Sequence, residues 1–177
     1  FPAPKFNEAF YSSNDFVATI SKVTDEIVRI VSPNVDREYV PHAVDEKWFK
    51  KIDKEKIEKN RKIFFKENLL DDNGDEKMVF FWNNRNARRK QSGSLIWWYK
   101  EFLDKVGYDK AILMMHTEPK DQHGQDLEAI IQELGLINGE VVFSLEKVDP
   151  DHLSQVYNAA DCTVNISDAE GFGLSTL

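Results

Sequence analysis

Short apolar runs of strand length alternate with helical patterns over the second two-thirds of the chain. The runs span residues 78–82, 111–115, 141–143 and 162–166. After each of the first three runs, apolar residues recur at helical spacing: Leu95, Trp98, Tyr99, Phe102 and Val106, then Leu127, Ile130, Ile131 and Leu134, then Leu153, Val156, Tyr157 and Ala160. Continuous apolar strands between amphipathic helices are typical of a parallel sheet covered on both faces. The pattern predicts a Rossmann-like, doubly wound α/β domain whose ligand site lies beyond the carboxyl ends of its strands.

The first 54 residues follow a different pattern. A strand is predicted at residues 16–20, and a helix follows from its N-cap, Ser21, to Val31. Residues 38–45 form an extended segment, because Pro41 excludes a helix there. The strongly charged residues 47–54 indicate a linker. We therefore expect a first part at 1–46, a linker at 47–54, and a main domain at 55–177 that opens with a helix at 55–69.

The composition narrows the class of protein. A chain of 177 residues with 41% hydrophobic residues can bury one main core. A formal net charge of -8 disfavours binding to nucleic acid or anionic lipid. No apolar run approaches the roughly 20 residues of a membrane helix, and the one cysteine, Cys162, cannot form an internal disulfide. A soluble, cytoplasmic protein is the expectation.

The loop after the 78–82 strand is the first candidate site. It carries four cations, Arg85, Arg88, Arg89 and Lys90. Arginine, lysine and the N–H groups at the start of a helix are groups that bind phosphate oxygens. A solvated basic turn is the alternative. The flanking aromatic residues also raise the possibility of nucleic-acid binding, but most of their rings fall on core positions of a strand or helix, which argues against it.

The loop after the 162–166 strand is the second candidate site. Its residues are Glu170, Gly171, Phe172, Gly173 and Leu174. Two glycines just before a predicted helix start let backbone N–H groups approach a ligand closely. The Glu170 carboxylate can accept hydrogen bonds from sugar hydroxyls. An ordinary glycine turn with a solvated carboxylate is the alternative.

Taken in order, four stretches resemble the retaining nucleotide-sugar glycosyltransferases of the GT-B fold, in family 4 (glycosyl transferases group 1). Residues 18–22 are similar to the last strand and helix start of the acceptor domain, and residues 39–45 to the crossover into the donor domain. Arg85 and Lys90 are similar to the pair that grips the donor diphosphate. Residues 158–161 and 170–174 resemble the segment around the first glutamate of a Glu-x7-Glu motif. The chain thus looks like a truncated donor-binding C-terminal domain with a small remnant of the acceptor domain.

Three positions depart from the family pattern. Asn84 stands where the family usually has glycine before the arginine, and Ala43 replaces the crossover glycine. The second glutamate of the motif would be position 178, one residue beyond Leu177. Because that residue and most of the acceptor half are outside the sequence, this fragment alone is expected to be inactive.

The resemblance implies roles for the candidate residues. Arg85 and Lys90 would stabilise the leaving diphosphate and Glu170 would hold the donor sugar, which makes these three the catalytic set. The donor-binding set is Gly171, Phe172, Gly173, Leu174, Phe143 and Ser144, with the base near the backbone of residues 143–147. No metal and no cofactor are implied.

The implied reaction is transfer of a sugar from a nucleotide diphosphate to an acceptor, with retention at the anomeric carbon. The donor would be a UDP-, GDP- or ADP-sugar, and the acceptor a saccharide, a lipid or a protein. A nucleotide-sugar epimerase of the same fold and a non-catalytic nucleotide-binding module remain the alternatives.

Residue types that commonly bind metal ions occur together from the end of the 111–115 strand to the start of the 127–134 helix. The residues are His116, Glu118, Asp121, His123, Asp126 and Glu128. They are spread over a strand end, a loop with Pro119 and a helix start. A solvated loop and an acidic first helical turn account for them better than a metal site.

Overall fold

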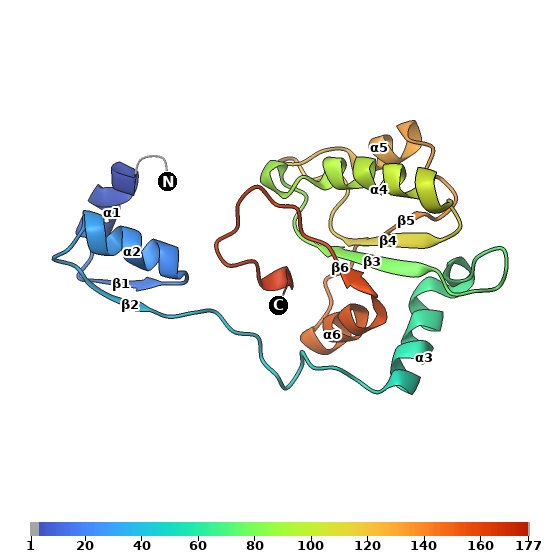
Figure 1. Ribbon diagram of the computed structural model, residues 1–177, viewed down its shortest axis with the longest axis horizontal. Helices are drawn as coiled ribbons and strands as arrows, with labels where there is room; N and C mark the ends of the chain where they lie inside the picture. The colour runs from blue at the N-terminus through green and yellow to red at the C-terminus, as the bar shows by residue number, and fades with distance from the viewer. Residues whose placement is uncertain (1–3, 177) are drawn as a thin grey trace. The chain divides into compact units, whose positions relative to one another are not determined.

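The computed structural model describes residues 4–176, which form two compact units. The smaller unit consists of the residues up to Val44 together with 170–175, and the larger of residues 45–169 with Thr176. Figure 1 shows the elements of each unit along the chain. Within the part of the chain that is described, no helix has the length and apolar character needed to cross a membrane.

The larger unit is built on a four-stranded parallel sheet. Its strands are β3 (Met78–Asn83), β4 (Ala111–His116), β5 (Val141–Ser144) and β6 (Cys162–Thr163). Their order across the sheet is β5-β4-β3-β6, so the chain winds first to one side of β3 and then crosses to the other. Phe80 of β3 pairs with Leu113 of β4 and with Cys162 of β6.

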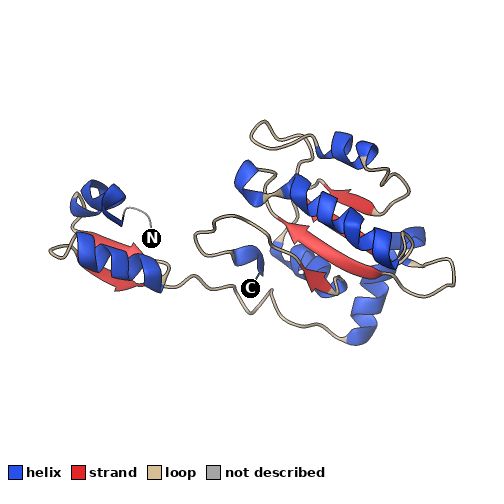
Figure 2. Cartoon of the chain, turned by 45° about the horizontal axis from the view of Figure 1, so that its top comes forward, coloured by secondary structure: helices blue, strands red, loops and turns tan. Residues whose placement is uncertain are grey.

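Helices cover both faces of this sheet, as the sequence predicts. They are α3 (Lys54–Phe65), α4 (Ser92–Val106), α5 (Leu127–Glu133) and α6 (Pro150–Ala159), and the 3-10 turn η2 (Lys66–Leu69) follows α3. Helices α4 and α5 lie on one face and α3 and α6 on the other (Figures 1 and 2). The doubly wound α/β architecture is therefore confirmed.

The alternation of side chains along the strands explains why there are two apolar layers. Phe80 and Trp82 of β3 face the layer beneath α4 and α5. Val79 and Phe81 face the layer beneath α3 and α6. Because successive side chains of a strand point to opposite faces, a run that is apolar at every position supplies both layers. Phe81 and Trp82 are fully buried.

The smaller unit contains a two-stranded parallel sheet. Its elements are η1 (Pro4–Asn7), α1 (Glu8–Ser12), β1 (Phe16–Thr19), α2 (Lys22–Val31) and β2 (Asp36–Tyr39), and β1 pairs with β2. Ser21 caps α2 as predicted, since its side chain accepts a hydrogen bond of 3.1 Å from the backbone N–H of Thr24. The short helix α1 was not expected from the sequence.

Helix α4 buries a stripe that matches the predicted one at Leu95 and Tyr99, with Phe102 packed partly buried against the core. Leu95, Ile96, Tyr99 and Leu103 are buried, whereas Trp98 is 54% exposed. Val106 (42% exposed) and Trp97 (53%) also face outward. The buried positions i, i+1, i+4 and i+8 form a helical stripe that is rotated towards Ile96 and Leu103. The side chains of Trp97 and Trp98 therefore lie outside the apolar core.

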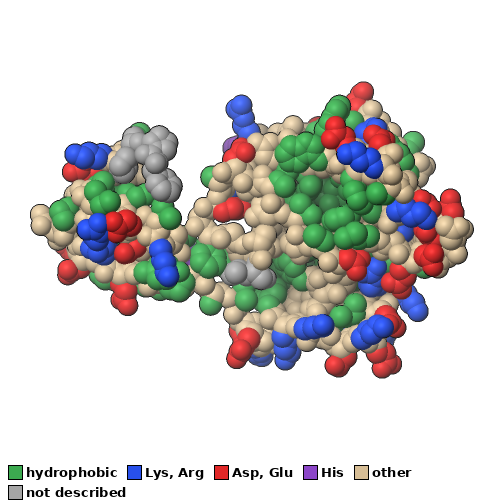
Figure 3. Space-filling model, in the orientation of Figure 1, with side chains coloured by type: hydrophobic (Ala, Val, Ile, Leu, Met, Phe, Trp, Pro, Cys, Tyr) green, Lys and Arg blue, Asp and Glu red, His purple; other side chains and the backbone are tan. Residues whose placement is uncertain are grey.

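The two outward tryptophans line a cavity of about 510 Å³ beside α5. Figure 3 shows hydrophobic side chains around a hollow where α4 and α5 lie in Figure 1. The last strand also differs from expectation, because β6 ends at Thr163 rather than at residue 166. One further bond, from the Val164 N–H to the Phe81 carbonyl (2.8 Å), extends the pairing.

Candidate functional site

A cleft of about 360 Å³ opens at the carboxyl ends of β3, β4 and β5. This is the edge at which the sequence predicts a ligand site, because the loops that follow parallel strands all leave from the same side of the sheet. The lining residues all belong to the larger unit and are Asn83, Asn84, Arg85, His116, Thr117, Glu118, Ser144, Leu145, Glu146 and Lys147.

Arg85 reaches this cleft from the loop after β3 and is held there by a carboxylate. Its Nε donates to Oδ2 of Asp121 at 2.6 Å, and its Nη2 donates to Oδ1 at 3.0 Å. The Arg85 side chain is 60% exposed and that of Asp121 only 13%. Hydrogen bonds from Arg85 and from the His123 backbone N–H lower the pKa of Asp121 to about 2. The pair is therefore ionised at any working pH.

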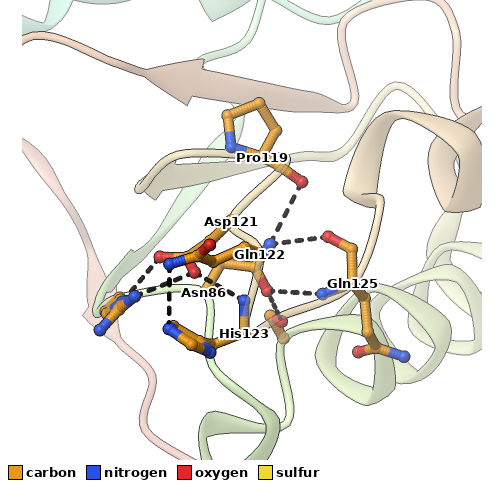
Figure 4. Close-up of polar contacts among 8 residues, drawn as sticks. Asn86, Pro119, Asp121, Gln122, His123 and Gln125 are labelled. Atoms are coloured by element: carbon orange, nitrogen blue, oxygen red, sulfur yellow. Dashed lines mark hydrogen bonds and ion pairs between the residues drawn. The ribbon is translucent and has the colours of Figure 1, made fainter.

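Asn86 ties the same loop to the loop after β4 and is completely buried. Its amide nitrogen donates to the carbonyls of Pro119 (3.1 Å) and Gln125 (2.7 Å). Its amide oxygen accepts from the Ser92 hydroxyl (2.7 Å) and the Gln125 N–H (3.2 Å). Figure 4 shows this network and the neighbouring contact of Asp121. All four hydrogen-bonding positions of the Asn86 amide are thus used.

Gly124 permits this close packing of the two loops. A Cβ atom at this position would collide with the side chain and the carbonyl oxygen of Asn86. The Arg88 N–H also donates to the His123 carbonyl at 3.2 Å. The β4 loop therefore supports the basic loop from Arg85 to Arg88.

The rest of the basic loop forms the 3-10 turn η3 (Arg88–Lys90), and Lys90 is 7% exposed. Gln91, with φ 57°, adopts the left-handed conformation at the start of α4. In contrast, Asn84 is not among the described residues with positive φ, so the residue in the family's glycine position causes no backbone strain.

The loop after β6 meets the basic loop through Asp168 and Ala169. The Asp168 N–H donates to the Arg89 carbonyl at 2.9 Å, and Arg89 Nη1 donates to the Ala169 carbonyl at 2.7 Å. Gln91 Nε2 donates to the Asp168 carboxylate at 2.7 Å. Two loops that are about 80 residues apart in the sequence are thereby joined beside β3.

His116 and Ser144 form a polar pair in the cleft. They lie opposite one another in the β4–β5 register, and His116 Nδ1 is 2.8 Å from the Ser144 hydroxyl. Burial lowers the pKa of His116 below its ordinary value of 6.5. A neutral imidazole beside a hydroxyl can both donate and accept hydrogen bonds.

Two lining residues carry buried polar atoms without a hydrogen-bond partner in the described structure. They are Nδ2 of Asn84 and Oγ1 of Thr117, and the Thr117 residue is 8% exposed. Buried polar groups are normally bonded, because leaving one unbonded costs roughly 1–3 kcal/mol. Both atoms belong to residues that line the cleft.

The predicted site residues divide between the two units. Arg85 and Ser144 line the cleft, Phe143 packs partly buried against the adjacent core, and Lys90 is buried in η3. Residues 170–174 belong to the smaller unit. There Phe172 packs edge to face on His42, with 5.5 Å between the ring centroids. The 3-10 turn η4 (Leu174–Thr176) occupies the position of the expected helix start.

Five of the six candidate metal ligands make contacts with other protein groups, namely His116, Asp121, His123, Asp126 and Glu128. Asp126 caps α5 by accepting from the Ala129 N–H at 3.0 Å. Lys120 pairs with Asp126 and Glu128. Among residues 4–176, no three histidine, cysteine, aspartate or glutamate side chains gather into a group that could hold a metal ion.

Neither a protein-family model nor a curated protein matches the sequence. Solved structures do match. The C-terminal domain of a glycosyl transferase group 1 family protein (LpcC) from Francisella tularensis is 21% identical with a TM-score of 0.54, over 75% of this chain and 63% of that one. The apo structure of OtsA is 14% identical with a TM-score of 0.65, over 97% and 43%. The catalytic domain of starch synthase IV from Arabidopsis thaliana, bound to ADP and acarbose, is 12% identical with a TM-score of 0.57, over 90% and 36%.

This chain therefore spans less than two thirds of the length of each of these structures. At such identities the similarity concerns the fold, and it agrees with the sheet order and the two helical layers described above. The chain has the Rossmann-like fold of GT-B glycosyltransferase domains.

Proposed function

We propose that the protein is a glycosyltransferase and that this chain contains its nucleotide-sugar donor-binding domain. The observation that carries the proposal is the 360 Å³ cleft, which combines a fixed guanidinium, that of Arg85, with the unpartnered polar atoms of Asn84 and Thr117. Its volume lies within the range of about 300–1,000 Å³ that small-molecule and cofactor sites occupy. The fold shared with GT-B glycosyltransferase domains supports the same conclusion.

The proposed reaction is sugar transfer with retention at the anomeric carbon and without a metal ion. As the bond to the diphosphate breaks, negative charge develops on the phosphate oxygens and the sugar becomes oxocarbenium-like. Fixed cations near those oxygens stabilise the transition state more than the ground state, and this accelerates the step. Arg85 and Lys90 are assigned this role, and Arg85 is already oriented by Asp121.

The remaining candidate residues are assigned to the rest of the donor. The base and ribose would occupy the cleft beside Phe143 and Ser144, where Thr117 and His116 offer hydrogen bonds. Glu170 would bind the sugar hydroxyls. The backbone from Gly171 to Leu174 would supply N–H groups to the donor.

Nucleotide binding by this chain is the first test. Calorimetric titration with UDP, GDP and ADP, followed by their sugars, should give saturable binding for one base. Arg85→Ala should weaken it, because a charge-assisted contact to phosphate is lost. Arg29→Ala is the matched control, since Arg29 makes a comparable two-bond pair with Glu26 on α2, in the other unit.

Transfer by a longer protein that also includes an acceptor domain is the second test. Arg85→Ala should lower kcat by about 10²–10³-fold at saturating donor, as loss of one transition-state donor typically does. Unchanged turnover would remove Arg85 from the mechanism. Nucleotide binding with neither transfer nor donor hydrolysis would instead favour a non-catalytic module.

A further inference from the structure

Asp121 lies in the loop between β4 and α5, whereas Arg85 lies in the loop after β3. Their contact therefore joins the loops that follow two different strands. The two residues are 36 positions apart, yet both carboxylate oxygens of Asp121 accept hydrogen bonds from Arg85. A two-bond arginine–carboxylate contact fixes the plane of the guanidinium as well as its position. Arg85 is therefore oriented, although more than half of its side chain is exposed.

The pair leaves most of the guanidinium available. Arginine has five N–H donors, and Asp121 uses one on Nε and one on Nη2. Three donors remain, on Nη1 and on the second hydrogen of Nη2. Phosphate oxygens can accept these bonds while the Asp121 contact stays in place.

Asp121 is itself held in place by its own loop. Its Oδ1 also accepts the His123 N–H at 2.8 Å, and its carbonyl accepts the Gly124 N–H at 2.9 Å. The flanking carbonyls of Pro119 and Gln125 are bound by the buried Asn86 (Figure 4). These contacts hold the Asp121 carboxylate in the position from which it orients Arg85.

From this geometry we propose that Asp121 is a positioning residue that holds Arg85 in the orientation that receives the diphosphate of the donor. The inference rests on the proposed function and goes further, because it assigns a role to a residue of the β4 loop. An exposed arginine must otherwise lose side-chain rotational freedom when it binds. Asp121 removes that cost before the ligand arrives.

The opposite role would be competition, in which Asp121 occupies Arg85 and must be displaced by phosphate. One observation favours positioning: the contact uses only two of the five donors, so displacement is not required. The two roles predict opposite effects of removing the Asp121 charge.

The test is a titration of the chain with UDP, GDP and ADP in four forms: wild type, Asp121→Asn, Arg85→Ala and the double variant. Asp121→Asn should weaken binding of the preferred nucleotide by roughly 3- to 10-fold, the effect of immobilising one flexible side chain. In the Arg85→Ala background the same substitution should have no further effect, because Asp121 acts through Arg85. A purely structural role would weaken binding in both backgrounds.

Two controls separate positioning from general damage. Glu26→Gln removes the carboxylate of the comparable Arg29 pair in the other unit and should leave binding unchanged. Asp121→Glu should recover part of the lost affinity, since the carboxylate is restored. In wild type the ¹H–¹⁵N signal of Arg85 Nε should be sharp, and in Asp121→Asn it should broaden or disappear through exchange with water.

The binding results distinguish failure of the positioning role of Asp121 from failure of the proposed nucleotide-binding function. Equal or tighter binding by Asp121→Asn, with nucleotide binding intact in wild type, would overturn the positioning role and leave the proposed function standing. An equal loss in both backgrounds would also overturn it. Absence of binding for every nucleotide in wild type would overturn the proposed function, and the positioning role with it.

Discussion

The two ends of the main sheet each hold an arginine against carboxylates, but the arginines are held differently. At the amino end, Arg61 of α3 is 7% exposed, and its Nε donates to Glu76 at 3.0 Å. Its Nη1 donates to the Ala159 carbonyl (2.9 Å) and to Asp161 (3.0 Å), and its Nη2 to the Lys77 carbonyl (2.9 Å). At the carboxyl end, Arg85 makes two bonds and its side chain is 60% exposed.

The difference shows how burial separates a structural cation from one that can bind a ligand. Arg61 donates four hydrogen bonds to groups just before β3 and β6, and these bonds connect α3 to both strands. Few donors remain for a ligand. Arg85 keeps most of its donors at the mouth of a cleft, on the side of the sheet where loops can vary without disturbing the core.

The largest effect is expected at the amino end. Arg61→Ala should lower the free energy of unfolding by about 3 kcal/mol, because it leaves the Ala159 and Lys77 carbonyls without their partner, while Asp161 is partly exposed and keeps its bond from the Val79 N–H. Urea denaturation followed by circular dichroism measures the loss. Arg85→Ala should leave the urea midpoint nearly unchanged, and a large loss there would end the distinction between the two arginines.

Substitution of Asn86 should give the next largest effect. It tests how much the Asn86 hydrogen bonds stabilise the loops at the carboxyl end of the sheet. Asn86→Ala removes four hydrogen bonds, three of them to Pro119 and Gln125 of the β4 loop, and it should cost about 2 kcal/mol. It should also weaken nucleotide binding, since the support of Asp121 is lost. Proteolysis of the β4 loop, compared with wild type, should be faster. Normal stability and a protected loop would show that the network does not hold the loop.

The sequence predicts the sheet and its layers well, because strand and helix periodicities are local. The apolar runs at β3 and β4 and the N-cap of α2 were all expected, and the structure contains them. Periodicity predicted the buried stripe of α4 only in part. Leu95 and Tyr99 are buried as expected, whereas Trp98, on the same predicted stripe, is 54% exposed.

The site itself was predicted only in part, for a physical reason. The loop position and its charge point to Arg85, and strand order places Ser144 in the same cleft. The partners of Arg85 and Arg61 come from segments 36 and 100 positions away, and no local pattern records such pairings. Asp121 carried a weak signal as a member of a cluster of acidic residues and histidines, but nothing in the sequence indicated its contact with Arg85.

Thr117 tests whether an unpartnered polar group marks a ligand site. Thr117→Val removes a buried hydroxyl that has no partner while keeping the shape, so it should raise the free energy of unfolding by up to about 1 kcal/mol. Nucleotide binding should become weaker. Tyr99→Phe is the matched control, because Tyr99 belongs to α4 and its hydroxyl is also buried, but it does not line the cleft. Equal binding by both variants would show that the Thr117 hydroxyl does not meet the ligand.

The smallest effect concerns acid stability and tests whether the Arg85–Asp121 contact persists in solution. The pKa of Asp121 falls from its ordinary value of 3.8 to about 2, chiefly through the hydrogen bond from Arg85. Because the folded-state pKa is the lower one, the stabilisation is complete above pH 4 and is lost as the pH falls from there towards 2. Asp121→Asn should therefore reduce the drop in urea midpoint between pH 5 and pH 2.5. Asp71, whose pKa is also about 2 through Lys110, provides a second site for the same substitution. If Asp71→Asn reduces the drop and Asp121→Asn does not, the contact at the cleft is not maintained in solution, and Arg85 is free to move before a ligand binds.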